Sequence, residues 1–346
     1  MISTLTLKEC KISMLNKKMK ETAIVTGGAG FIGSHLVDLL LLKNFKVIVI
    51  DNLSGGHKNN IIHHKKNKNF FFFKKNICDK KIQKLKLGKV DYIFHFAGKG
   101  DIVPSIEKPS LYFDTNVSGT INVLELARKL RIKKFIYAAS SSCYGLAKVP
   151  TSEKHPLDPR YPYALSKMMG EDVCKHWSKL YKIPYISIRI FNAYGPRVKT
   201  TGAYGAVFGV FFKQKLSGKP FTLVGDGKQK RDFLFVKDVA NAFFMCAVSN
   251  KINRIYNLGA GAPQSILNLI KILKGRFTKI PRRPGEPNCT WANINKIKKE
   301  IKWSPKIKFI EGVNIMLKDI DKWKDAPLWN RAKIRKATKT WFEYLS

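Results

Sequence analysis

The chain has 346 residues, of which 45% are hydrophobic and 12% aromatic, a composition typical of a globular enzyme with one large domain or two smaller ones. Its formal net charge of +40 suits a polyanion-binding protein, but the lysines are spread through every segment and form no stripe, so we expect no nucleic-acid partner. No apolar run reaches the roughly 18 residues of a membrane-spanning helix, and we expect no membrane partner.

The sequence carries no clear targeting or metal-binding signal. Residues 1–20 lack the apolar stretch of a secretory signal, and we expect them to form a poorly ordered extension of a cytoplasmic protein. The 6 cysteines show no CxxC pair and no metal-ligand spacing with histidine, which is typical of reduced thiols. His57, His63 and His64 lie in a lysine-rich polar segment, and from their spacing we predict no metal site.

Strand-like and helix-like segments alternate along the first half of the chain. The apolar runs expected as strands are 23–25, 46–50, 70–73, 92–96, 135–138 and 185–190. Helical patterns cover 31–42, 117–130 and 163–180. This alternation predicts an α/β fold with a Rossmann-like, doubly wound parallel sheet. Because each strand run is almost wholly apolar, we expect helices to cover both faces of the sheet.

The pattern loosens after Gly195, where glycine and proline become frequent. Shorter helices are expected at 239–248 and 266–273. We assign residues 21–190 to a Rossmann-like dinucleotide-binding domain and residues 191–346 mainly to a smaller mixed α/β substrate lobe with a helical C-terminal tail. Some segments of this second part are expected to return to the sheet. Three tryptophans of the tail are expected to anchor it in the core: Trp323, Trp329 and Trp341.

A glycine-rich turn joins the first strand to the first helix. Gly27, Gly30 and Gly33 form a GxxGxxG variant. Gly27 permits a tight turn, Gly30 lets the backbone approach a pyrophosphate, and Gly33 lets the helix pack closely on the strand. Asp51 ends the second strand, at the distance expected for contact with a ribose hydroxyl. Since an acid there repels a 2′-phosphate, the pattern predicts NAD rather than NADP as the cofactor.

A tyrosine and a lysine share one face of the helix expected at 163–180. Tyr163 and Lys167 are four positions apart, about one helical turn. We expect the lysine ammonium to lower the pKa of the tyrosine toward the range of a general base. Three serines begin at Ser140, at the carboxyl end of the fifth strand, which is the edge where open α/β sheets bind ligands. These groups predict proton transfer beside a bound dinucleotide.

Nine motifs occur in order along the chain. They are Thr26–Gly33 (TGGAGFIG), Asp51–Leu53 (DNL), His95–Gly98 (HFAG), Asn116–Thr120 (NVSGT), Ser140–Gly145 (SSSCYG), Pro162–Lys167 (PYALSK), Arg189–Arg197 (RIFNAYGPR), Arg231–Phe233 (RDF) and Arg283–Glu286 (RPGE). From about Thr22 to Ile310 the chain resembles an extended short-chain dehydrogenase/reductase of the NAD-dependent nucleotide-sugar epimerase/dehydratase family. Within it, the 4-epimerase branch typified by UDP-glucose 4-epimerase is the most similar.

This resemblance implies roles for individual residues. Tyr163 is the implied catalytic base, Lys167 its partner and Ser140 the active-site hydroxyl. The residues implied to bind the cofactor are Gly27, Gly30, Phe31, Ile32, Gly33, Asp51, Asn52, Asn76, Ile77, Phe96, Ala97, Gly98, Asn116, Tyr163 and Lys167. The residues implied to bind the substrate are Ser140, Ser142, Asn192, Tyr204, Arg231 and Arg283. Asn76 stands where the family has aspartate, which affects the strength of the adenine contact rather than its existence.

The resemblance implies a UDP-sugar 4-epimerase acting on a hexose or a hexuronate. In the dehydratase branch an Asp-Glu pair follows the active-site hydroxyl, whereas this chain has Ser141 and Ser142, which cannot act as acid and base in an elimination. Decarboxylases of the family usually have a glutamate there too. The resemblance therefore favours an epimerase, with a dehydratase or a decarboxylase as the alternatives.

Further expectations concern assembly and other classes of function. By analogy with the family, the helices at 117–130 and 163–180 imply a homodimer. Some proteins of this fold bind a dinucleotide without catalysis, but they lose the Tyr–Lys pair, which this chain retains at Tyr163 and Lys167. A non-catalytic dinucleotide-binding protein and a polyanion-binding protein remain as alternatives.

Overall fold

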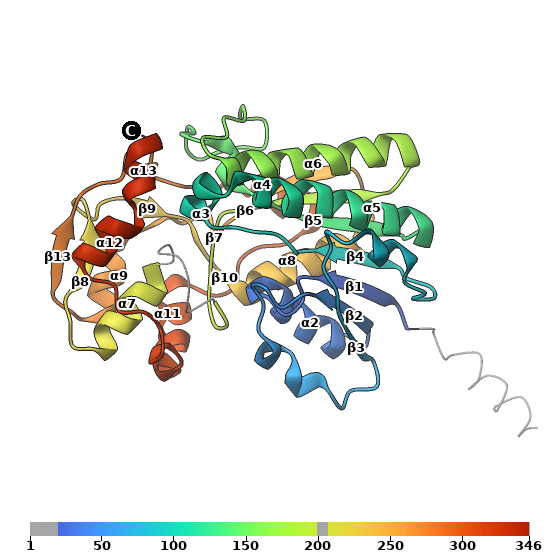
Figure 1. Ribbon diagram of the computed structural model, residues 1–346, viewed down its shortest axis with the longest axis horizontal. Helices are drawn as coiled ribbons and strands as arrows, with labels where there is room; N and C mark the ends of the chain where they lie inside the picture. The colour runs from blue at the N-terminus through green and yellow to red at the C-terminus, as the bar shows by residue number, and fades with distance from the viewer. Residues whose placement is uncertain (1–19, 199–206, 346) are drawn as a thin grey trace, which may run out of the picture.

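A computed structural model describes residues 20–198 and 207–345 of the chain. The molecule has a larger lobe built on a central sheet and a smaller lobe that contains most of the C-terminal segments (Figure 1). None of the helices in these ranges is long and apolar enough to cross a membrane.

Seven parallel strands form the sheet of the larger lobe, in the order β11-β6-β5-β4-β1-β2-β3. They are β1 (Thr22–Thr26), β2 (Lys46–Asp51), β3 (Phe70–Lys74), β4 (Tyr92–His95), β5 (Lys134–Ser140), β6 (Tyr185–Ile190) and β11 (Arg254–Leu258). The strand order reverses between β1 and β4, and such a switch point opens a crevice at the carboxyl ends of the strands. The predicted Rossmann-like, doubly wound sheet is confirmed.

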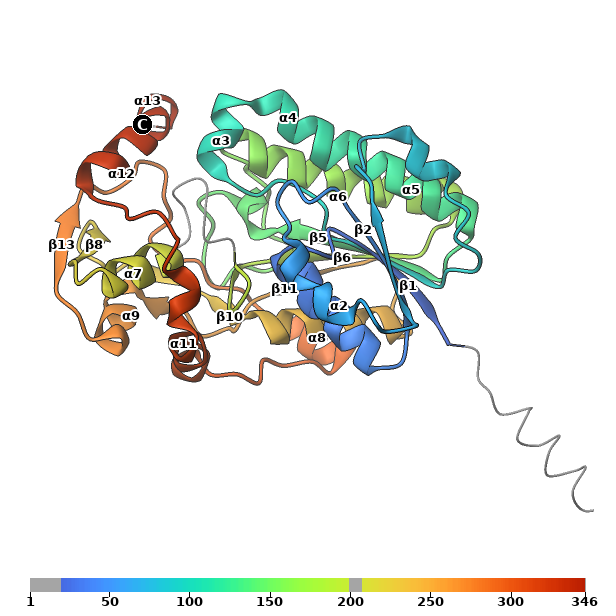
Figure 2. The same cartoon turned by 60° about the horizontal axis from the view of Figure 1, so that its bottom comes forward.

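Helices cover both faces of this sheet (Figures 1 and 2). One face carries α2 (Phe31–Leu42) and α8 (Val236–Val248). The other carries α3 (Ile102–Glu107), α4 (Pro109–Phe113), α5 (Gly119–Leu130) and α6 (Pro162–Tyr181). A wide π turn, η4 (Asp114–Ser118), joins α4 to α5, so α5 begins two residues later than the helix expected from residue 117.

One strand differs from the expectation that both sheet faces are fully covered. In β3 all five residues are partly or fully exposed, and Phe71 is 39% exposed. The reason is its place in the sheet, because β3 is the outermost strand and pairs only with β2. The run of four phenylalanines that starts at Phe70 was therefore a correct signal for a strand and a wrong one for complete burial.

Segments from the C-terminal half complete the larger lobe. Strand β11 pairs with β6, and α8 packs against the sheet beside α2. The remaining segments form the smaller lobe around three two-stranded sheets, which pair β7 with β10, β9 with β12 and β8 with β13. These strands are β7 (Asn192–Tyr194), β8 (Phe221–Val224), β9 (Lys230–Arg231), β10 (Phe233–Phe235), β12 (Gln264–Ser265) and β13 (Phe277–Ile280).

The helices of the smaller lobe surround an aromatic core that includes Phe211, Phe212 and Trp323. They are α7 (Val207–Leu216), α9 (Ile266–Leu273), α11 (Phe309–Lys318), α12 (Arg331–Ala337) and α13 (Lys339–Tyr344), while α10 (Asn295–Ile301) lies against β11. Short 3-10 turns are η1 (Lys58–Asn60), η2 (Ile62–His64), η3 (Lys80–Lys84), η5 (Ser141–Tyr144) and η6 (Ile320–Trp323).

A buried ion pair ties α6 to the sheet. Arg189 on β6 donates from Nε to Glu171 Oε2 over 3.1 Å and contacts Oε1 through Nη2. Ser187 Oγ donates a further hydrogen bond of 2.6 Å to the same carboxylate. Arg189 also donates from Nη1 to Tyr144 Oη over 2.7 Å. The charges are thus satisfied inside the protein, which fixes the helix that carries Tyr163 and Lys167.

We predict that Glu171→Gln lowers the free energy of unfolding by about 3–5 kcal/mol, because it leaves the Arg189 charge buried without compensation. Urea denaturation measures this change. Asp158→Asn, which breaks a pair with Arg160 in which both side chains are at least half exposed, is the matched control and should cost less than about 1 kcal/mol. Equal costs for the two variants would contradict a structural role for the buried pair.

Candidate active site

The glycine turn between β1 and α2 is packed too tightly for side chains. Gly27 has φ of 70°, and a Cβ on it would lie 2.6 Å from the backbone N of Ala97. A Cβ on Gly33 would lie 2.3 Å from the carbonyl oxygen of Gly27. Helix α2 starts at Phe31 with Gly30 as its N-cap and no side-chain cap, so its first N–H groups are available to an anion. The turn therefore fits a pyrophosphate.

Asp51 lies beside this turn and is 7% exposed. Its Oδ2 accepts a hydrogen bond of 3.0 Å from Ala29 N, and its Oδ1 accepts one of 2.7 Å from Leu53 N. Burial raises the pKa of this carboxyl, while the two backbone hydrogen bonds act in the opposite direction. The carboxylate is held at the end of β2, where the sequence places the ribose contact.

The other predicted cofactor residues follow neighbouring strands at the same edge of the sheet. Phe96, Ala97 and Gly98 come directly after β4, and the Phe96 ring lies 4.5 Å from that of Phe243 on α8. The remaining ones lie as follows: Phe31 and Ile32 open α2, Asn52 follows β2, and Asn76 and Ile77 follow β3. Of the last pair, Asn76 is exposed and accepts a hydrogen bond from Cys78 N, whereas Ile77 is only 4% exposed.

Tyr163 and Ser140 are directly hydrogen-bonded. Tyr163 Oη donates to Ser140 Oγ over 3.0 Å, and Ser140 Oγ also accepts from Ser142 N over 3.1 Å. Ser140 is the last residue of β5, and Tyr163 lies in the first turn of α6, which Pro162 opens at a position where a missing N–H costs nothing. The two hydroxyls predicted from distant motifs thus form one unit. Ser142 contributes its backbone N–H to it.

Lys167 lies one turn further along α6, with its Nζ 4.4 Å from the centre of the Tyr137 ring. A Cβ on Gly98 would lie 3.9 Å from that Nζ, so the ammonium sits against the residues that follow β4. Burial lowers the pKa of Lys167 to about 8. Lys167 is only 8% exposed, and its Nζ lies on the side of α6 that faces the segment after β4.

The expected effect of Lys167 on the tyrosine is wrong for the protein without ligands. Burial raises the pKa of Tyr163, and the hydrogen bond with Ser140 is the counteracting influence, whereas Lys167 is not among the causes. The physical reason is desolvation, since the protein interior stabilises a neutral phenol better than a phenolate. Proximity in sequence did not reveal how strongly the site excludes water.

Asn116 connects the Tyr–Lys helix to the segment after β4. Its Nδ2 donates to Ser166 Oγ over 2.9 Å and to Lys99 O over 3.0 Å, and its Oδ1 accepts from Lys99 N over 2.8 Å. Ser166 Oγ in turn donates to Tyr163 O over 2.8 Å. Asn116 sits in the π turn η4, and its side chain links Ser166 on α6 to the backbone of Lys99.

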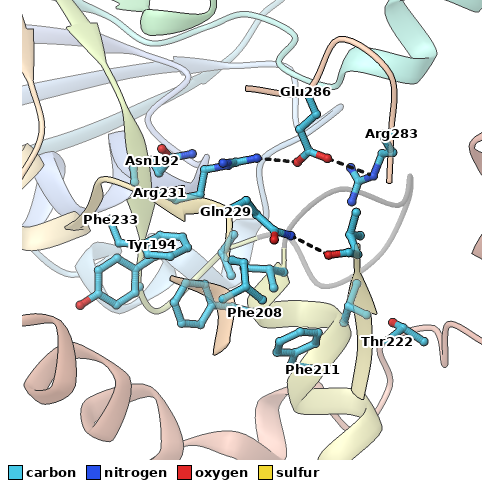
Figure 3. A pocket seen from close by; sticks show the side chains of 17 residues that line it. Asn192, Tyr194, Phe208, Phe211, Thr222, Gln229, Arg231, Phe233, Arg283 and Glu286 are labelled. Atoms are coloured by element: carbon cyan, nitrogen blue, oxygen red, sulfur yellow. Dashed lines mark hydrogen bonds and ion pairs between the residues drawn. The ribbon is translucent and has the colours of Figure 1, made fainter. Parts of the chain in front are cut away.

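The predicted diphosphate-binding arginines line a pocket in the smaller lobe (Figure 3). Arg231 donates from Nη2 to Glu286 Oε1 over 2.7 Å, and Arg283 Nε lies 3.7 Å from Glu286 Oε2. Asn192 lies on the same wall, where its Oδ1 accepts a hydrogen bond of 2.6 Å from Thr290 Oγ1. The guanidinium groups of Arg231 and Arg283 thus both contact the carboxylate of Glu286, and all three residues line the pocket. Tyr204 lies outside the described residues.

Several lining residues were not predicted from the sequence. The unforeseen members of the pocket include Tyr194, Phe208, Phe211, Thr222, Gln229 and Glu286. Glu286 was part of a quoted motif but received no role. The aromatic residues at 208, 211 and 212 gave a signal for an apolar wall, whereas Thr222 and Gln229 are isolated polar residues. Only the folded chain brings them together.

A row of aromatic rings lies between this pocket and Tyr163. The Tyr161 ring stacks on that of Tyr163 with centroids 6.3 Å apart, and it lies 6.5 Å from the ring of Trp341. The guanidinium of Arg283 lies 5.4 Å from the Trp341 ring, and Trp341 Nε1 donates to Pro284 O over 2.8 Å. Trp341 was expected as a core anchor of the tail. Trp341 is 6% exposed, as a core anchor would be. In addition, it contacts both Tyr161, next to Tyr163, and Arg283 of the pocket.

The sequence pattern described as the NAD dependent epimerase/dehydratase family matches residues 23–259. The chain belongs to this family. The predicted resemblance is confirmed at that level, and so is NAD as the cofactor, for which the glycine turn and Asp51 provide the expected setting.

Relatives of this family member include several sugar epimerases. A putative UDP-glucose 4-epimerase from Methanocaldococcus jannaschii is 38% identical over 299 residues, covering 84% of this chain and 95% of the relative. The structure of a UDP-N-acetylglucosamine 4-epimerase from Methanobrevibacter ruminantium M1 with UDP-N-acetylmuramic acid is 32% identical, with a TM-score of 0.83 over 88% of this chain and 99% of that chain. The UDP-glucuronic acid 4-epimerase from Bacillus cereus, with UDP-glucuronic acid and NAD, is 31% identical, with a TM-score of 0.81 over 87% and 99%.

We predict a pH signature of the buried lysine in the cofactor-free protein. Because burial lowers the pKa of Lys167 to about 8 from an unfolded value near 10.4, the unfolded chain binds more protons in the window between these values. The free energy of unfolding should therefore rise with pH from about 8 to 10, by on the order of 2 kcal/mol relative to Lys167→Met. Denaturation at a series of pH values measures it.

Lys175→Met, an exposed position on the same helix, is the control for this measurement and should follow the wild-type pH profile. Parallel profiles for the wild type and Lys167→Met would show that the ammonium is not desolvated.

Proposed function

We propose that the protein is an NAD-dependent 4-epimerase of nucleotide sugars, acting on a UDP-hexose or a UDP-hexuronate. The observation that carries this proposal is the 3.0 Å hydrogen bond between Tyr163 and Ser140, at the sheet edge that carries the cofactor cradle. The arginine pocket adjoining it through the aromatic row suits the diphosphate of the sugar donor.

In this mechanism the protein moves a proton at the sugar O4. When bound, NAD⁺ supplies an acceptor for the hydride of C4, and its reduced form can return it. Tyr163 takes the proton of O4. Ser140, which is hydrogen-bonded to Tyr163 Oη, shortens the path of that proton and donates a hydrogen bond to O4 as negative charge develops on it. Lys167 orients the cofactor side of the site. If the 4-keto sugar turned over within the site, its other face would be presented to the reduced cofactor, and Tyr163 would give the proton back to O4.

The residues beside Ser140 favour epimerisation over elimination. A 4,6-dehydratase needs an acid and a base next to the active-site hydroxyl, and those positions are Ser141 and Ser142 in the turn η5. A serine hydroxyl has no accessible carboxylate-like pKa, so neither can replace them. The absent carboxylates argue against a decarboxylase in the same way.

The sugar itself is proposed only as a class. The three proteins compared above are named for glucose, N-acetylglucosamine and glucuronic acid, so these three names agree on UDP and on C4 and differ in the sugar. Other similar proteins are named as a UDP-glucuronic acid decarboxylase and a dTDP-glucose 4,6-dehydratase. The substrate proposal therefore rests on the diphosphate-binding arginines and the Tyr–Ser pair, both of which act on parts that these sugars share.

We also propose a homodimer through α5 and α6. Met169 and Leu180 on α6 are 38% and 58% exposed, and their spacing of about three turns places them on one side of the helix. Tyr181, 40% exposed, extends the apolar surface next to Leu180. A second copy would cover these side chains.

We predict that incubation with a panel of UDP-sugars gives inversion at C4, followed by NMR of the sugar protons, and that Tyr163→Phe lowers kcat by about 10²- to 10⁴-fold. Binding of UDP should be unchanged in this variant, because Tyr163 is not part of the arginine pocket. Undiminished turnover in Tyr163→Phe would contradict the mechanism. A free 4-keto-6-deoxy product would instead indicate a dehydratase, and the absence of turnover with tight, salt-dependent DNA binding would indicate a polyanion-binding protein.

The diphosphate site generates a separate prediction. Arg283→Met should weaken UDP binding by about 10- to 100-fold, since a hydrogen bond to a charged group contributes roughly 1.5–3 kcal/mol. Isothermal titration calorimetry measures the affinity. The control is Arg282→Met, one residue earlier, which is not among the described residues that line the pocket. Equal losses in both variants would point to overall charge rather than to a specific grip.

A further inference from the structure

Two histidines and a carboxylate meet on the outer side of α2, away from the Tyr–Ser pair. His63 and His64 belong to the 3-10 turn η2, and Asp38 lies in the middle of α2. The Nε2 atoms of His63 and His64 lie 3.0 Å and 2.7 Å from the same oxygen, Asp38 Oδ1. One potential ligand atom from each residue therefore lies within 4.8 Å of the other two.

The distances resemble those between the ligands of a zinc ion. Bonds of about 2.0–2.1 Å in a tetrahedral site place neighbouring ligand atoms about 3.3 Å apart, so the Nε2 atoms of His63 and His64 would have to move away from Asp38 Oδ1 by about 0.3 and 0.6 Å to admit the ion. Imidazole nitrogen together with a carboxylate oxygen suits zinc, nickel, cobalt and copper, whereas magnesium and calcium prefer oxygen ligands.

We propose that Asp38, His63 and His64 form a binding site for a divalent transition-metal ion of the zinc class, with three protein ligands and the remaining positions open to solvent. Each imidazole would coordinate the ion through the lone pair of its Nε2. This site is independent of the proposed function.

Neighbouring residues hold Asp38, His63 and His64 in positions from which they could bind a metal ion. Arg197 Nη1 lies 2.8 Å from Asp38 Oδ2, the oxygen that the histidines leave free, and an outer cation of this kind orients a ligating carboxylate. The rings of His63 and His64 lie 4.0 Å apart, and the His64 ring lies 5.7 Å from that of Phe70. The His64 side chain is 16% exposed and that of His63 is 46% exposed, which leaves a path for the ion.

A metal ion there would join three segments that are distant in sequence. Asp38 belongs to the helix whose N-terminus forms the cofactor cradle, and the histidines belong to the segment between β2 and β3. Arg197 follows β7, the strand that supplies Asn192 to the arginine pocket. We therefore expect the ion to stabilise the fold around the cofactor and substrate sites.

The test uses the full chain without a histidine tag, titrated with ZnCl₂ by isothermal titration calorimetry and by thermal unfolding. We expect a single site and, at a hundredfold excess of zinc over its Kd, a rise in Tm on the order of 5 °C. The double variant His63→Gln/His64→Gln keeps donors toward Asp38 but loses both ligands. Its zinc affinity at this site should fall roughly 100-fold, with its metal-free Tm close to that of the wild type.

His57→Gln is the matched control, because His57 is exposed in the same segment and outside the cluster. It should bind zinc as the wild type does. Zinc binding that is equal in the wild type and the double variant would place the ion elsewhere, for instance on a cysteine, and would overturn the proposal. Absence of zinc binding to the wild type would also overturn it and leave the cluster as a hydrogen-bonded contact between α2 and η2.

Discussion

The buried contact between Glu171 and Arg189 is the constraint on which the active site depends. It fixes α6 against β6, and Gly170 lets the same helix approach β5, since a Cβ there would lie 2.2 Å from Tyr137 Oη. A pair of charges in the interior gains strength only when its hydrogen bonds are complete, and here Ser187 completes them. These contacts hold α6 in place along the sheet, with Tyr163 Oη 3.0 Å from Ser140 Oγ.

Exclusion of water then determines the electrostatics of the site. Burial raises the pKa of Tyr163 and lowers that of Lys167 to about 8, so the protein by itself favours a neutral phenol beside a weakly basic amine. As the proposed base, Tyr163 would have to lose its proton against this desolvation.

In the smaller lobe, two arginines lie close together beside one glutamate. Arg231 and Arg283 both contact Glu286, whose carboxylate compensates the repulsion between the two guanidinium groups. The C-terminal helix contributes to this arrangement, since Trp341 lies against Arg283 and Tyr161. Figures 1 and 2 place α13 next to α3, so the end of the chain spans both lobes beside the site.

The sequence by itself determined six strands of the sheet, the glycine turn and the candidate catalytic groups, whereas the seventh strand, β11, was not among the strands expected. Local signals were sufficient for these, because strands such as 185–190 are continuous apolar runs and Gly27 must adopt a positive φ. Only the tertiary structure decided what depends on burial or on distant partners: the half-exposed edge strand β3, the raised pKa of Tyr163, the role of Trp341, and the approach of Asp38 to His63 and His64. The physical reason is that desolvation and side-chain convergence arise from packing between segments, and a pattern along one segment carries no record of its neighbours in space.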